Sequence, residues 1–163
     1  MLNTTKTAHE AAHQLAFNTG IQTKGVDYPM WLSEGIATQF EIPDRTGTPD
    51  PLAVNDQRLS ALLEAQHDKR LIPLERLIME NPPAKIDSKA MNVWYAQSWA
   101  LFHYLYGQRR GAVEKILQAY RTIGANKTIS PEERARIVTQ ACGESLAALE
   151  KKYLAHAEKL SRK

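Results

Sequence analysis

The chain has 163 residues, of which 43% are hydrophobic, so it is long and apolar enough to form one domain around a hydrophobic core. The formal net charge is only +3 and the basic residues are dispersed, which argues against a nucleic-acid-binding protein. No apolar run approaches the ~20 residues of a membrane-spanning helix, and no secretory signal peptide is recognised at the start. The single Cys142 cannot form an internal disulfide and leaves the compartment open.

The first predicted helix spans residues 5–18, because this run contains neither proline nor glycine. It carries the pattern H-E-x-x-H, formed by His9, Glu10 and His13. Residues four apart lie on the same face of a helix, so the two imidazoles can reach one point. Zinc binds imidazole nitrogens, and a catalytic zinc site keeps one position for water. The spacing therefore predicts two metal ligands, with Glu10 placed as a general base for that water.

A second helix is predicted at residues 30–40, directly after Pro29. Its apolar residues leave little polar face, which predicts that the helix is buried. Glu34 lies in the middle of it, and a buried carboxylate without a partner costs several kcal/mol. A metal ion would supply that partner, so Glu34 is the candidate third ligand. Gly35 costs ~1 kcal/mol inside a helix, which predicts that another backbone comes close at this position.

These two motifs together resemble the gluzincin metallopeptidases, the thermolysin-like and aminopeptidase-like zinc clan. The resemblance rests on H-E-x-x-H followed by W-L-S-E-G-x-A at residues 31–37, whose Glu34 lies about two dozen residues after His9, and it is nearest to the peptidase-MA-like members. It implies that His9, His13 and Glu34 bind Zn²⁺ and that Glu10 is the general base and proton shuttle. It also implies a peptide or protein substrate.

A weaker part of the resemblance lies further along the chain, and the whole covers about residues 5–107. The segment Y-A-Q-S-W-A-L-F at residues 95–102 is similar to the helix that follows the site in those peptidases. The resemblance makes Tyr95 a candidate catalytic residue that stabilises an oxyanion. His103, eight residues later on the same helix, is interpreted as a core histidine or as a transition-state donor.

The chain departs from the gluzincin pattern in two respects. Gluzincins usually carry a mostly β subdomain before the motif helix, whereas eight residues precede His9 here, so we expect either a fragment of a longer protein or a missing substrate groove. Some gluzincins place an acidic residue four positions after the third ligand to orient a histidine, and Thr38 stands at that position. Such partners commonly change metal affinity by about 10- to 100-fold. Glu41 and Asp27 are the two candidates to replace it.

The remainder of the chain is predicted to be helical after a loop at residues 41–55, which is either a surface loop or the rim of the cleft. The helix at 89–106, capped by Ser88, is apolar almost all round and is expected at the centre of the core. His67, near the C-terminal end of its helix, is expected to be a structural or a surface residue. The other predicted helices, one of them capped by Asn55, span residues 55–68, 74–80, 112–123, 131–142 and 144 to the end, with a turn at 107–111.

No strand pattern is convincing, so the predicted fold class is all-α. We expect one domain over residues 1–163, with the motif core at about 5–107 and C-terminal helices at about 111–163. The favoured function is zinc-dependent peptide-bond hydrolysis. The alternatives are a non-catalytic helical binding or scaffold domain that retains a metal site, and a coincidental motif on a surface helix. Cobalt or manganese would also suit a His-His-Glu ligand set.

Overall fold

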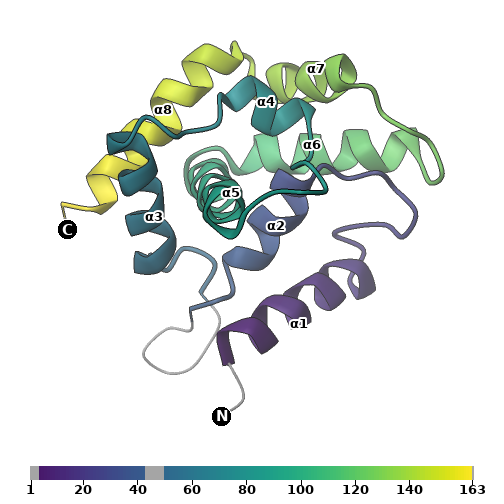
Figure 1. Ribbon diagram of the computed structural model, residues 1–163. Helices are drawn as coiled ribbons and strands as arrows, with labels where there is room; N and C mark the ends of the chain where they lie inside the picture. Colours follow the sequence, from purple (N-terminus) through teal and green to yellow (C-terminus); the bar gives the residue numbers. More distant parts are fainter. Residues whose placement is uncertain (1–3, 43–49, 163) are drawn as a thin grey trace.

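The computed structural model describes residues 4–42 and 50–162, and within them the chain forms eight α-helices and no strand (Figure 1). The all-α prediction is confirmed, and each of the eight helices overlaps one of the ranges predicted to be helical. The helices are α1 (Thr4–Asn18), α2 (Met30–Thr38), α3 (Asp56–His67), α4 (Leu74–Met79), α5 (Ser88–Gln108), α6 (Arg110–Ile123), α7 (Pro131–Cys142) and α8 (Leu146–Leu160). Residues 43–49, most of the predicted loop at 41–55, lie outside the described residues.

Helix α5 forms the centre of the molecule, as its apolar sequence predicts. It packs against α2, α3, α6 and α8, which surround it in Figure 1. Every residue from Val93 to Leu105 is buried except Tyr95. Such a helix gains its stability from apolar burial on all sides, so its one partly exposed aromatic ring marks a position where the core opens to the surface.

Helix α2 lies directly on α5, and Gly35 allows this close contact. A Cβ atom at Gly35 would lie 2.8 Å from the Cβ atom of Phe102 and 3.0 Å from the backbone oxygen of Ser98. The expectation of a close backbone approach at this glycine is therefore confirmed. Because Trp31 and Leu32 of the same helix are fully buried, α2 is fixed in position and Glu34 is held with it.

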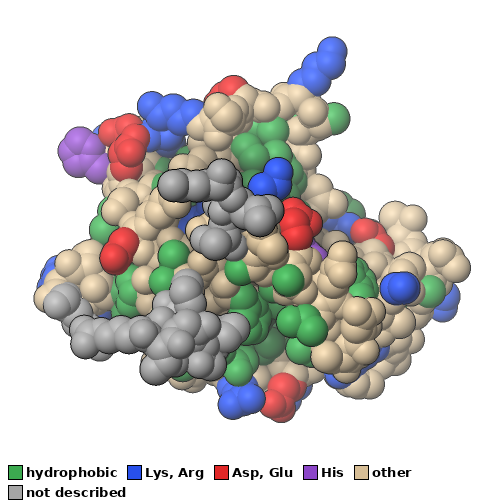
Figure 2. All heavy atoms as spheres, turned by 90° about the horizontal axis from the view of Figure 1, so that it is seen from below, with side chains coloured by type: hydrophobic (Ala, Val, Ile, Leu, Met, Phe, Trp, Pro, Cys, Tyr) green, Lys and Arg blue, Asp and Glu red, His purple; other side chains and the backbone are tan. Residues whose placement is uncertain are grey.

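Helix α1 packs against α2 through small side chains, Ala12 and Ala16, which are 5% and 2% exposed. Other apolar residues near its C-terminal end face solvent. Figure 2 shows the molecule from below, relative to the view of Figure 1, and hydrophobic side chains gather near the middle of the face seen there. The large exposed apolar residues of the described chain are Leu15, Phe17, Ile21 and Leu52. None of the helices in the described ranges has the length and apolarity to cross a membrane.

The helix ends follow local side-chain chemistry at most predicted positions. Asn55 caps α3 by accepting a hydrogen bond from the backbone N–H of Arg58. Ser130 caps α7, and Gly143 ends it in the left-handed conformation with φ 66°. The cap of α5 is Asp87 and not Ser88, because the Asp87 carboxylate accepts from the N–H of Ala90.

The turn predicted at residues 107–111 is wrong in its extent. Helix α5 continues through Gly107, and α6 begins at Arg110, so only Arg109 separates them. Its φ of −144° and ψ of 41° break the helix at a single residue. Packing on both sides of the break outweighs the modest cost of a helical glycine, which is ~1 kcal/mol.

Candidate metal centre

Helices α1 and α2 bring the three predicted metal ligands together. The Nε2 atoms of His9 and His13 lie 3.2 Å apart. His9 Nε2 is 3.0 Å from Oε2 of Glu34, and His13 Nε2 is 3.5 Å from Oε1 of the same carboxylate. Each of the three residues thus offers one ligand atom, and these three atoms all lie within 4.8 Å of one another. The side chains are mostly buried, with exposures of 12%, 22% and 17% for His9, His13 and Glu34.

The spacing of these atoms fits a single metal ion. Ligand atoms ~2.0–2.1 Å from a tetrahedral ion lie about 3.3 Å from one another, which is close to the observed separations. The Oε2 atom of Glu34 is also buried without a hydrogen-bond partner, although His9 Nε2 is only 3.0 Å away. The imidazole and the carboxylate therefore approach each other without forming a well-aligned hydrogen bond, as expected for two ligands that share a target.

Electrostatics favour a positive charge at this point. The neighbouring carboxylates of Glu34, first, and Glu41 raise the pKa of His9 to about 9. Burial opposes ionisation of Glu34, but the adjacent His13 and His9 outweigh it and lower the Glu34 pKa to about 2. At neutral pH, without a metal, the site thus holds an imidazolium beside an ionised carboxylate. A divalent cation would replace that proton.

Glu41 takes the orienting position that the sequence left open between two residues. Its Oε1 atom lies 3.0 Å from Nδ1 of His9, on the side of the ring opposite the ligand nitrogen. A proton held on Nδ1 by this carboxylate leaves Nε2 free to bind a metal. Asp27 instead pairs with Arg134 of α7 at 2.8 Å. Thr38 donates its hydroxyl hydrogen to the backbone oxygen of Glu34.

Asn55, the N-cap of α3, and Arg58, in the first turn of α3, hold the Glu41 carboxylate. The sequence did not predict this role for either residue. Asn55 donates from Nδ2 to Oε2 of Glu41 at 2.8 Å, and Arg58 pairs with Oε1 at 2.7 Å. Burial opposes the charge on Glu41, which is 4% exposed, but His9 and Arg58 outweigh it, so the Glu41 pKa is lowered. The capping signal at Asn55 predicted the helix start, but no local pattern indicates a contact with a carboxylate fourteen residues earlier.

The two proposed catalytic residues lie on a cavity beside the ligands. Glu10 and Tyr95 line an open cavity of about 290 Å³, together with His9. The rings of His9 and Tyr95 meet edge to face, with centroids 6.2 Å apart. Burial and then the charge of Glu34 raise the pKa of Tyr95 above its ordinary value, so the phenol keeps its proton. The remaining residues of the cavity wall are Thr5, Lys6, Glu41, Gln57 and Arg58.

His103 and His67, the other two histidines considered in the sequence, lie outside the metal centre. His103 is a core residue, 4% exposed, whose ring nitrogens contact Nε2 of His156 at 3.1 Å and the backbone oxygen of Leu52 at 3.2 Å. It is two helical turns, about 12 Å along the axis, from Tyr95. The side chain of His67 is 89% exposed, as expected for a surface residue.

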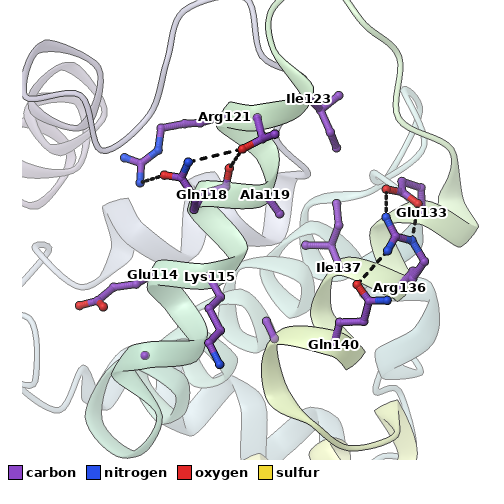
Figure 3. Close-up of a pocket in the computed structure, with 13 residues that line it drawn as sticks. Glu114, Lys115, Gln118, Ala119, Arg121, Ile123, Glu133, Arg136, Ile137 and Gln140 are labelled. Carbon is purple, nitrogen blue, oxygen red and sulfur yellow. Dashed lines mark hydrogen bonds and ion pairs between the residues drawn. The ribbon is translucent and has the colours of Figure 1, made fainter.

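A second, wider cavity of about 950 Å³ lies between α6 and α7 (Figure 3). Its floor is apolar, with Ile123 and Ile137, and Arg136 binds Glu133 and Gln140 along its rim. None of the candidate ligands or catalytic residues lines it, so it is separate from the metal centre.

Comparison with known proteins gives one match. The model of a family described as "Protein of unknown function (DUF1570)" matches residues 3–126, which include His9, Glu10, His13, Glu34 and Tyr95. The matched span ends just after α6, so α7 and α8 lie beyond it. No curated protein and no solved structure matches the chain.

Proposed function

The chain belongs to the DUF1570 family, and we propose that it is a zinc-dependent hydrolase of peptide bonds. The observation that carries the proposal is the convergence of His9, His13 and Glu34 beside a cavity that Glu10 and Tyr95 line. The ligands and the acid–base group that metal-assisted hydrolysis requires come from α1 and α2, and Tyr95 comes from α5.

Zinc is the metal that best suits two imidazoles and one carboxylate. When bound, it would act as a Lewis acid and lower the pKa of a water in its open position to about 7. The protein's contribution is to hold three ligand atoms at a fitting spacing. Glu41 adds to this by fixing the His9 ring.

Glu10 is the residue placed to move protons. It follows His9 directly on α1, and its side chain is exposed on the cavity. Its carboxylate accepts a proton from the attacking water as the water oxygen bonds to the scissile carbonyl carbon. The same proton is then delivered to the amide nitrogen as the carbon–nitrogen bond breaks, so that the products are a carboxylic acid and an amine.

Tyr95 is placed to stabilise the charge that develops on the carbonyl oxygen. Its phenol is protonated, partly exposed and adjacent to His9. A phenol O–H group donates a hydrogen bond to an oxyanion, and removing one such donor typically costs about 10²–10³ in kcat. The ring is fixed on α5, so little reorganisation is needed when the charge appears.

The proposal is tested by measuring metal content and hydrolysis in parallel. The full chain, purified without a histidine tag, is compared with His13→Ala and Glu10→Gln by plasma mass spectrometry and with a set of quenched fluorescent peptides. We expect about one zinc per chain in the native protein and in Glu10→Gln, and none in His13→Ala. Of these three proteins, only the native chain is expected to hydrolyse the peptides.

The exposed histidine gives a matched control, since His67→Ala should keep both zinc and activity. Zinc retained in His13→Ala at the native level would refute the metal centre. Zinc lost in His13→Ala without hydrolysis by the native chain would favour the alternative of a non-catalytic binding domain that retains a metal site.

A further inference from the structure

The carboxylate of Glu41 is bound on three sides. It accepts hydrogen bonds from His9 Nδ1 at 3.0 Å, from Asn55 Nδ2 at 2.8 Å, and from both Nε and Nη2 of Arg58 at 3.0 and 2.7 Å. A buried carboxylate requires such partners, because leaving it unpaired costs several kcal/mol. The partners do more than satisfy the charge, since they leave Glu41 one orientation in which to meet His9.

Arg58 provides the strongest of these contacts. Its guanidinium faces Glu41 with two nitrogens that reach different carboxylate oxygens, which is the fork geometry that lysine cannot reproduce. The third nitrogen donates to Oδ1 of Asn92 on α5 at 3.2 Å. The same group lies over the face of the Tyr95 ring, with its central carbon 5.0 Å from the ring centroid. One side chain thus contacts both Glu41, which orients His9, and the Tyr95 ring itself.

Asn55 fixes the start of α3 so that Arg58 points toward the centre. Its side-chain oxygen accepts from the Arg58 backbone N–H at 3.1 Å, while its nitrogen donates to Glu41. Asparagine can do both because its amide carries an acceptor and a donor. An aspartate would also cap the helix, but it would face Glu41 with a second negative charge.

We propose that Arg58 is a positioning residue of the metal centre. It acts through Glu41 on the His9 ring and through direct contact on the Tyr95 ring. The inference rests on the proposed function for the identity of the site, but it concerns a residue of α3, a helix that supplies no ligand. In this arrangement the first turn of α3 forms the outer support of the site, and the packing of α3 on α5 sets how firmly the ligands are held.

The test measures metal affinity and metal geometry with Co²⁺ and Zn²⁺ alone. The full chain, Arg58→Ala, Arg58→Lys, Glu41→Gln and the double variant Arg58→Ala/Glu41→Gln are titrated with Co²⁺ while visible absorption is recorded, and Zn²⁺ affinity is obtained by competition. Arg76→Ala is the matched control, because Arg76 is half-exposed and pairs with Glu80, four residues later. Circular dichroism of each metal-free variant checks that it is folded.

We expect Arg58→Ala to weaken Zn²⁺ binding by about 10-fold or more and to change the Co²⁺ spectrum. Arg58→Lys should recover only part of the affinity, because it keeps the charge and loses the fork. If Arg58 acts through Glu41, the double variant should bind no more weakly than Glu41→Gln alone, whereas independent effects would add. The Lys variant serves the same comparison if the Ala variant does not fold.

The outcomes separate the two proposals. Native affinity and spectrum in both Arg58 variants, or additive losses in the double variant, would overturn the role of Arg58 and leave the metal centre intact. Failure of the native chain to bind Co²⁺ or Zn²⁺ would overturn the centre itself and this role with it. Normal metal binding without hydrolysis would overturn the peptidase activity alone.

Discussion

Replacing Gly35 by alanine tests how far the site depends on the contact between α2 and α5. The added Cβ would lie 2.8 Å from Phe102 Cβ and 3.0 Å from the Ser98 backbone oxygen, against a preferred separation of about 3.5–4.0 Å for such atoms. One of the two obstacles is backbone, so a side-chain rotation cannot remove the overlap. Helix α2 must move away from α5 by several tenths of an ångström.

The expected loss combines two opposing effects. Overpacking a core typically costs 1–3 kcal/mol, and replacing glycine by alanine in a helix returns ~1 kcal/mol, which leaves a net destabilisation of about 1 kcal/mol. For a chain of this size the melting temperature should fall by roughly 2–4 °C. Zinc affinity should fall as well, because Glu34 precedes the substituted residue and moves with the helix.

Thermal unfolding followed by circular dichroism measures the first effect, and Co²⁺ titration the second. Gly111→Ala in α6 is the matched control, since no atom of the described residues, apart from the adjoining helix backbone and chain neighbours, lies within 4 Å of a Cβ atom at Gly111. It should leave the melting temperature unchanged or slightly raised. A Gly35→Ala protein as stable as the native chain, with native metal affinity, would show that the two helices can separate freely and that the reasoning is wrong.

Charged and titratable groups in the site and in the core give four further predictions. Glu34 chiefly raises the pKa of metal-free His9 to about 9, so Zn²⁺ binding between pH 6.5 and 9 should release a proton and the affinity should rise about tenfold per pH unit. Calorimetry in buffers of different ionisation enthalpy measures this proton, and finding no release would contradict the prediction. The same raised pKa stabilises the metal-free fold fully below pH 6.5, and this contribution should disappear as the pH rises through 9, which urea unfolding across that range would detect. Asn55→Asp keeps the cap but sets a carboxylate beside Glu41, so it should weaken Zn²⁺ binding more than Asn55→Ser does; equal affinities would argue against a close contact. Burial lowers the pKa of His103, so stability should decrease as the pH falls below 6.5, where the unfolded chain takes up a proton first, and this loss should be smaller in His103→Gln.

The ligands could be predicted from the sequence because local rules place them. Helical geometry alone sets His9 and His13 on one face, and a carboxylate in an apolar helix calls for a partner, which identified Glu34. The same kind of rule predicted the central position of α5, where apolar residues surround the helix.

The supports of the site could not be predicted, because they depend on how distant segments meet. The sequence left Glu41 and Asp27 as two candidates to orient a histidine ligand. The turn after α2 brings Glu41 back to His9, whereas Asp27 contacts Arg134 of α7, more than a hundred residues later in the chain. The contact of Arg58 with Glu41 is of the same kind, since it joins the first turn of α3 to the turn after α2. Sequence periodicity carries no information about such a contact.

The placement of α1 determines how easily this helix can separate from the rest of the fold. This helix supplies two of the three ligands, yet it packs mainly on α2 through two alanines, and larger apolar side chains on it are exposed. Little apolar area therefore holds it, and such a segment can open locally while the remaining helices stay folded. A cation shared with Glu34 would join α1 to the core, and at a free concentration of 100 Kd it would add about 2.7 kcal/mol to the cost of that opening. In this protein the cation would then cross-link α1 to α2, and the free metal concentration would decide whether α1 is packed on the other helices.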